Sequence, residues 1–71
     1  MSIDWKKELA INIRNRRKEL GLTQNDLAKK VGIGRTTISR IENEFHNPYL
    51  DTLEKLAKAL EIDPKNLFRT D

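Results

Sequence analysis

Polar side chains between Arg35 and Asn43 have the spacing of one face of an α-helix. At about 100° per residue, Thr36, Ser39, Arg40 and Asn43 fall on one side, with Arg35 at the leading end. Hydroxyl, amide and guanidinium groups of these sizes can bond to base edges and phosphates. The predicted base contacts, in a DNA major groove, come from Arg35, Thr36, Ser39 and Arg40. Arg40 is favoured for guanine, and for Arg35 base and phosphate contact stay open; the alternative for all four is an ordinary exposed face.

Apolar residues indicate the helices that must hold this face in place. Ile38, Ile41 and Phe45 fall opposite the polar side chains, and the stretch from Gln24 to Val31 has an apolar side of its own. Gly32 lies between the two stretches, where a helix end commonly needs a positive φ. Two helices joined by such a turn match the helix-turn-helix description.

The rest of the chain predicts three more helices and no strands. A first helix opens at Ser2 or Asp4 and runs to about Leu20, and a fourth spans 50–60. A short fifth helix begins at Asp63-Pro64 and continues through Leu67 and Phe68. The predicted fold is all-α: a compact five-helix domain covering residues 1–71, with the helix-turn-helix as its second and third helices. Its expected apolar positions are Trp5, Leu9, Ala10, Ile13, Leu20, Leu27, Ala28, Val31, Ile38, Ile41, Leu50, Leu53, Leu56, Ala57 and Leu60.

Composition argues against several other classes of protein. There is no cysteine and only one histidine, so no metal site is expected. No nucleophile–base pair is evident, and we expect no enzymatic activity, cofactor or small-molecule ligand. No apolar run approaches the ~18 residues of a membrane span, so a cytoplasmic location without membrane contact is expected. Residues 1–43 hold ten basic and five acidic residues, whereas residues 44–71 hold four and six, so one end favours a polyanion.

Eight positions resemble those of the phage-repressor and Cro-like helix-turn-helix family, the lambda-repressor-like fold. They are Gln24, Leu27, Ala28, Val31, Gly32, Ile33, Ile38 and Ile41. The stretches LGLTQ (20–24), IEN (41–43) and NPYLDTLEKLAKAL (47–60) are also similar, so the likeness covers roughly residues 9–68. The resemblance implies DNA binding, with dimer contacts in the last third of the chain.

The resemblance also implies roles for residues outside the polar face. Gln24 corresponds to a phosphate-binding residue, and Arg17 and Glu42 correspond to an ion pair that ties the first helix to the third. Phosphate contact is a possible second role for Arg17. Asn25 and Asn43 are candidates for phosphate contact, with plain capping or solvation as an equal alternative.

Three positions depart from the family pattern. Gly34 stands where Ser or Thr commonly caps the recognition helix, and Tyr49 stands where a small capping residue is common. Glu44 follows the Glu-Asn pair, where the family often has Gly. Because a carboxylate repels the DNA backbone, we expect Glu44 to point away from it or its loop to follow a different path.

Two groups of side chains are not expected to make specific contacts with a partner. A solvated basic face is expected from Arg14, Arg16 and Lys18. Core positions are expected for the large apolar side chains Phe45, Tyr49, Ile62 and Phe68, whereas Ile11 is expected to be exposed.

Together these features predict a sequence-specific, double-stranded DNA-binding transcriptional regulator. It would bind a near-palindromic operator as a homodimer, with half-sites roughly 34 Å apart. A phage-type repressor and a restriction–modification controller protein both suit the small size. The alternative is an antitoxin or adaptor that uses the same fold to bind a protein through Phe45, Tyr49 and the acidic last third.

Overall fold

The computed structural model describes residues 4–70, which form four α-helices and a 3-10 helix. The α-helices are α1 (Trp5–Glu19), α2 (Gln24–Val31), α3 (Arg35–Glu42) and α4 (Leu50–Ala59), and the 3-10 helix is η1 (Pro64–Phe68). The all-helical class is confirmed, and each α-helix lies within one or two residues of its predicted bounds. The predicted short fifth helix lies in the expected segment after the Asp63 cap, but it is a 3-10 helix, so a count of five α-helices is not confirmed.

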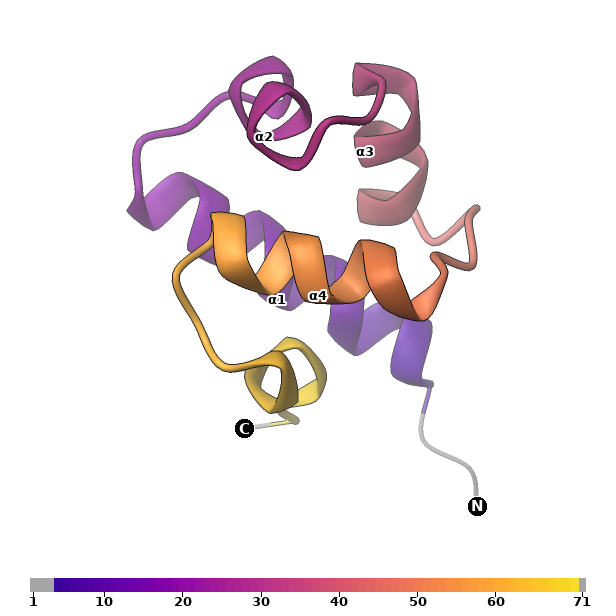
Figure 1. Cartoon of the computed structure of the whole chain (residues 1–71). Helices are drawn as coiled ribbons and strands as arrows, with labels where there is room; N and C mark the ends of the chain where they lie inside the picture. The colour runs from indigo at the N-terminus through magenta and orange to yellow at the C-terminus, as the bar shows by residue number, and fades with distance from the viewer. Residues whose placement is uncertain (1–3, 71) are drawn as a thin grey trace.

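The helices are arranged around α1, which contacts both α3 and η1. Figure 1 shows α2 and α3 side by side at the top, α4 crossing in front of α1, and η1 below them. α2 packs against both α3 and α4, and α3 packs against α1, so both helices of the helix-turn-helix contact the rest of the domain. α3 is therefore supported from behind by α1 and from the side by α2.

A single core joins all five elements. Eleven of its residues are buried: Leu9, Ile13, Leu27, Ala28, Val31, Ile38, Ile41, Leu56, Ala57, Leu60 and Leu67. Ten of these lie at predicted core positions, which confirms the helical periodicity over α1 to α4. Leu50 was predicted on the apolar side of α4 but is 80% exposed, because it begins the helix beyond the reach of α2 and η1. Trp5 also lies at the margin, 42% exposed, with its ring 6.4 Å from that of Phe68.

Side-chain caps begin three of the helices. The Asp4 carboxylate accepts from the Lys7 N–H at 3.3 Å; the alternative start, Ser2, lies outside the described residues. At α2, the Thr23 hydroxyl accepts from the Asp26 N–H at 3.0 Å, and the Asp26 carboxylate accepts from the Thr23 N–H at 2.9 Å. This reciprocal pair is a capping box, which satisfies two N–H groups that a helix start leaves free. Gly34 begins α3 without a side-chain hydrogen bond.

Left-handed residues end all four α-helices. They are Gly21 and Gly32, with φ of 71° and 85°, and Glu44 and Glu61, with φ of 66° and 58°. After each of them, the next backbone N–H bonds to the carbonyl five residues earlier, as in Phe45 to Arg40 at 2.8 Å. This geometry satisfies carbonyls of the last turn. The positive φ expected at Gly32 is confirmed, whereas the same conformation at the two glutamates carries no glycine signal in the sequence.

Candidate nucleic-acid interface

The exposed face of α3 carries the predicted base-contacting side chains. Arg35, Thr36 and Arg40 are exposed, and Ser39 is half-buried. Within the described part of the chain, Arg35, Thr36 and Arg40 form no side-chain hydrogen bond or ion pair. Their donors are therefore free to meet a ligand. Ile38 and Ile41 fix the opposite side of α3 in the core, so the helix cannot rotate without exposing them.

Asn43 forms the C-terminal cap of this face. Its Nδ2 group donates to the Ser39 carbonyl at 2.9 Å and lies 3.4 Å from the Ser39 hydroxyl. The amide donor is thus engaged within α3, which corresponds to the capping alternative. Its remaining acceptor oxygen offers no attraction to a phosphate.

A buried carboxylate, Glu42, joins α3 to the helices around it. Arg17 Nε donates to Glu42 Oε2 at 2.8 Å, and Arg17 Nη2 donates to Glu42 Oε1 at 3.0 Å. Gln24 Nε2 donates to the same Oε1 at 3.3 Å, and Arg14 Nε lies 3.8 Å from it. We call Glu42 with Arg14, Arg17 and Gln24 the Glu42 cluster. It links α1, α2 and α3 directly behind the exposed face.

Each of the three nitrogens of the Arg17 guanidinium donates a hydrogen bond within the domain. Its Nη1 donates to the Leu22 carbonyl at 2.9 Å, and the other two nitrogens bond to Glu42. The side chains of Arg17 and Glu42 are only 11% and 2% exposed. The hydrogen bond to Glu42 raises the pKa of Arg17 despite the opposing effect of burial. The structural role of Arg17 is observed in these contacts, whereas its second role, phosphate contact, stays a prediction.

Arg14 and Arg16 are not the solvated cations that the sequence suggested. Arg14 Nη2 donates to the Glu42 carbonyl, and Arg16 Nε donates to the Leu60 carbonyl, each at 2.8 Å. These contacts satisfy carbonyls at the ends of α3 and α4, where a helix has no partner of its own. Lys18 remains exposed. No local sequence signal identifies the two arginines, because their partners lie far along the chain.

Gln24 and Asn25 occupy the first turn of α2. Gln24 is half-buried by its contact with Glu42, and Asn25 is exposed. The backbone N–H groups of this turn lie at the positive end of the helix macrodipole. The Gln24 amide is engaged by Glu42 at 3.3 Å, and phosphate contact by Gln24 and Asn25 stays a prediction.

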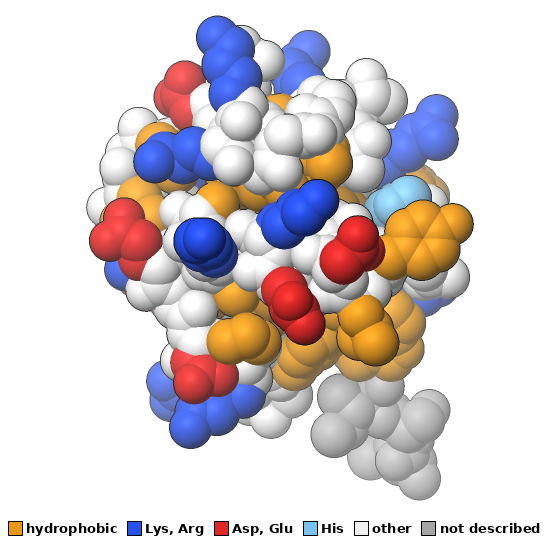
Figure 2. All heavy atoms as spheres, in the orientation of Figure 1, with side chains coloured by type: hydrophobic (Ala, Val, Ile, Leu, Met, Phe, Trp, Pro, Cys, Tyr) orange, Lys and Arg blue, Asp and Glu red, His pale blue; other side chains and the backbone are white. Residues whose placement is uncertain are grey.

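An apolar surface lies next to the candidate interface, in the segment that connects α3 to α4. The aromatic residues Phe45 and Tyr49 are 82% and 78% exposed, so the expectation that they belong to the core is wrong. With Leu50 they form what we call the Phe45–Leu50 patch. Figure 2 shows hydrophobic side chains gathered beside the single histidine, His46, where α3 leads into α4. Phe45 leaves the core because the left-handed turn at Glu44 ends the helical periodicity before it.

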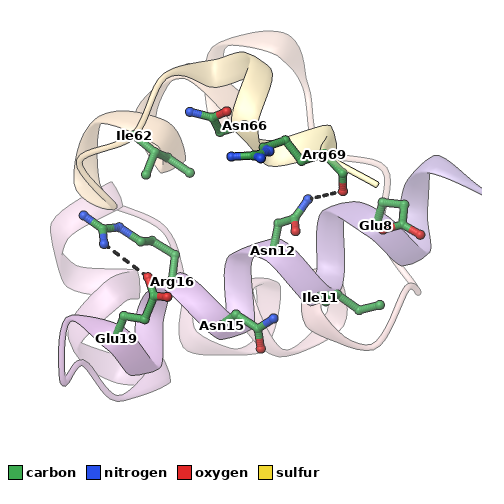
Figure 3. Close-up of a pocket in the computed structure, with 9 residues that line it drawn as sticks. All are labelled: Glu8, Ile11, Asn12, Asn15, Arg16, Glu19, Ile62, Asn66 and Arg69. Atoms are coloured by element: carbon green, nitrogen blue, oxygen red, sulfur yellow. Dashed lines mark hydrogen bonds and ion pairs between the residues drawn. The ribbon is translucent and has the colours of Figure 1, made fainter. Parts of the chain in front are cut away.

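The back of α1 forms an open groove with the C-terminal segment. The groove has a volume of about 550 Å³ and is lined by polar groups and two isoleucines, Ile11 and Ile62. Figure 3 shows Asn12 reaching across it; Asn12 Nδ2 donates to the Leu67 and Arg69 carbonyls at 2.9 and 3.0 Å. Ile11 is 37% exposed, which confirms its expected position. The two hydrogen bonds from Asn12 hold the C-terminal segment against α1.

Within residues 4–70, no group of three or more His, Cys, Asp or Glu side chains is placed to hold a metal ion. No helix in the same range has the length and apolar character needed to cross a membrane.

Comparison with known proteins places this architecture among regulators. The control protein C.SmaI of Serratia marcescens is 43% identical over 68 residues, which cover 94% of this chain and 81% of that protein. The crystal structure of the hypothetical transcription factor NHTF from Neisseria has a TM-score of 0.90 at 35% identity, covering 93% of this chain and 76% of that one. Antitoxin HipB of Escherichia coli (strain K12) is 42% identical over 55 residues, 78% of this chain and 62% of that protein.

A helix-turn-helix family profile matches residues 13–67, from the middle of α1 to η1. The match includes all eight positions, from Gln24 to Ile41, on which the resemblance rested. This protein belongs to the helix-turn-helix family.

Proposed function

We propose that this protein is a sequence-specific, double-stranded DNA-binding transcriptional regulator of the repressor or controller type. The observation that carries the proposal is the exposed face of α3, on which Arg35, Thr36 and Arg40 have no partner within residues 4–70. A cluster of unpaired donors on a helix held rigidly by the core suits insertion into a major groove. The similarity to C.SmaI, a control protein, supports the controller type.

In this arrangement each group has a separate task. Arg40 would pair with a guanine, and Thr36 and Ser39 would contact neighbouring base edges. Gln24 and Asn25 would contact phosphate at the start of α2, which sets the position of the protein on the duplex. The Glu42 cluster would hold α2 and α3 at a fixed angle, so that phosphate and base contacts form together.

A homodimer would bring two such faces to one operator. The Phe45–Leu50 patch supplies the surface, because three large apolar side chains are exposed within six residues. Three such side chains offer on the order of 400 Å², about half of what each partner buries in a standard interface. A two-fold interface uses the same patch on both copies. Dimerisation would place the two α3 helices about 34 Å apart, one turn of the duplex.

Selection of bound duplexes from a random pool, followed by fluorescence anisotropy, tests the proposal. The expected result is a near-palindromic consensus that binds at least 100-fold more tightly than a scrambled duplex at physiological salt. Equal affinity for the consensus and the scrambled duplex would overturn it.

Similarity to antitoxin HipB supports a second candidate function, that of a protein-binding module. In this function the Phe45–Leu50 patch would bind a toxin-like partner protein. The salt dependence separates the two. Duplex affinity that falls steeply as salt rises favours the regulator, since phosphate contacts release counterions. Absence of duplex binding even at 50 mM salt favours the second candidate.

A further inference from the structure

Glu44 occupies a position that is unfavourable for its side chain. It ends α3 with φ of 66°, a conformation in which every residue except glycine carries steric strain at Cβ. Its N–H donates to the Ile41 carbonyl at 3.2 Å, so the turn itself is satisfied by backbone alone. The carboxylate is exposed and forms no ion pair or side-chain hydrogen bond with residues 4–70. Local stability therefore gives no reason for glutamate here.

Electrostatics at the end of α3 are also unfavourable for a carboxylate. The C-terminus of a helix is the negative end of its macrodipole, which repels another negative charge. Glu44 adjoins Asn43, the last residue of the polar face, and consecutive Cα atoms are about 3.8 Å apart. In the proposed complex the DNA backbone would pass the end of α3, and charges closer than one Debye length, about 10 Å at 0.1 M salt, are only partly screened.

We propose that Glu44 is an affinity-lowering residue that repels the DNA backbone at the end of the recognition helix. This inference rests on the proposed function. Phosphate attraction supplies the sequence-independent part of DNA binding, and base contacts supply the specific part. Repulsion by Glu44 lowers affinity for every duplex by a similar factor. The protein then remains bound only where base contacts from α3 supply the missing affinity.

Glu61 provides a matched control within the same chain. It ends α4 with φ of 58°, is exposed, and its N–H donates to the Lys58 carbonyl at 3.1 Å. Figure 1 shows that α4 begins beside the end of α3 and finishes at the other side of the molecule. Glu61 there lines a shallow groove with Lys30 and Lys58 rather than the polar face of α3. Substitution at 44 or 61 changes the same charge and the same kind of backbone strain.

Three variants separate charge from strain: Glu44→Gln, Glu44→Gly and Glu61→Gly. Affinities for the selected operator and for a scrambled duplex are measured at 50 and 300 mM salt, with urea denaturation in parallel. Both Glu44 variants should bind both duplexes about three- to tenfold more tightly at 50 mM salt, and the gain should shrink at 300 mM salt. Glu61→Gly should leave both affinities within twofold of the parent. Both glycine variants should raise the urea midpoint, and Glu44→Gln should raise it less than Glu44→Gly, because it removes the charge but keeps the strained Cβ.

The outcomes distinguish this inference from the function beneath it. Unchanged or weakened binding by Glu44→Gln, with operator preference retained by the parent, overturns the role of Glu44 alone. An equal gain in Glu61→Gly also overturns it, since the effect would then be one of net charge. If the parent binds neither duplex at 50 mM salt, both the proposed function and this inference fail.

Discussion

At the scale of single residues, the Glu42 cluster explains how a charged group can be buried behind a binding surface. A buried ion without partners costs several kcal/mol, but here the carboxylate accepts three hydrogen bonds. Arg17 is held by the same contacts and by the Leu22 carbonyl. The residues that face the solvent on α3 therefore depend on a buried ion pair behind them, Arg17 with Glu42.

Removal of the Glu42 carboxylate should destabilise the whole domain. Glu42→Ala leaves Arg17 buried without its partner, and we expect the free energy of unfolding to fall by roughly 3–5 kcal/mol. Urea denaturation followed by circular dichroism measures the change. Glu19→Ala is the control, since the Glu19–Arg16 pair at 3.2 Å is largely exposed on the Glu19 side. That variant should lose about 0–1 kcal/mol. Similar losses in the two variants would show that Glu42 is not the central contact.

Arg40 and Gln24 should affect DNA binding in different ways. Arg40→Ala should cost roughly 1–3 kcal/mol against the selected operator and relax preference at one base pair. Gln24→Ala should weaken all duplexes alike, because phosphate contacts carry no sequence information. Competition anisotropy with single-base variants of the operator resolves the two patterns. Loss of the native circular dichroism spectrum in both variants would instead contradict the assignment of faces.

At the scale of the elements, the helix ends determine where each helix begins and stops. The capping box at Thr23 and Asp26 begins α2 through contacts of 2.9 and 3.0 Å. The same carboxylate is sensitive to acid. The Thr23 N–H that donates to it, followed by the Thr23 hydroxyl, lowers the pKa of Asp26 below its usual value of 3.8.

The lowered pKa of Asp26 predicts the direction of a pH effect. A group whose folded-state pKa lies below its unfolded value stabilises the fold fully above the unfolded value, and this contribution is lost as pH falls through the folded value. Asp26→Asn should therefore lower stability at pH 7 and flatten the loss of stability below about pH 4. Thermal unfolding between pH 2 and 7 measures this. Asp26→Asn should lose little of this difference when the same scans are repeated in high salt, because hydrogen bonds rather than distant charges lower the pKa of Asp26 most.

At the scale of the whole molecule, the Phe45–Leu50 patch directly follows the polar face of α3, in the connection from α3 to the start of α4. The largest apolar patch on a monomer, typically about 300–600 Å², is often functional. Its closeness to α3 means that a partner seated on it would affect how the recognition helix is presented. Dimerisation and DNA binding should therefore be coupled.

Leu50→Lys tests the patch directly. Full burial of a leucine stabilises by roughly 1.5–3 kcal/mol, and a two-fold interface loses two copies, so dimerisation should weaken by about 3 kcal/mol or more. The dimer fraction measured by sedimentation equilibrium and the affinity for the operator should fall together. Ile11→Lys is the control, because Ile11 is a partly exposed aliphatic in the groove behind α1. If Leu50→Lys and the parent sediment alike, the patch is not the dimer surface.

Much of this architecture could be predicted from the sequence, because the relevant signals are local. Apolar residues three and four positions apart identified ten of the eleven residues of the buried cluster. Gly32 marked the end of α2 through a conformation that its own chemistry favours. The polar face of α3 followed from the same periodicity, since a helix that buries Ile38 and Ile41 must expose the opposite side.

Only the tertiary structure decided which polar groups meet and which apolar groups stay outside. Arg14 and Arg16 looked like solvated cations because their acceptors, the Glu42 and Leu60 carbonyls, lie 28 and 44 residues away. Phe45 and Leu50 looked like core residues because hydrophobicity does not report where a neighbouring helix ends. Local sequence encodes the conformation of a segment, whereas the partner of a side chain depends on the packing of segments that are distant in the chain.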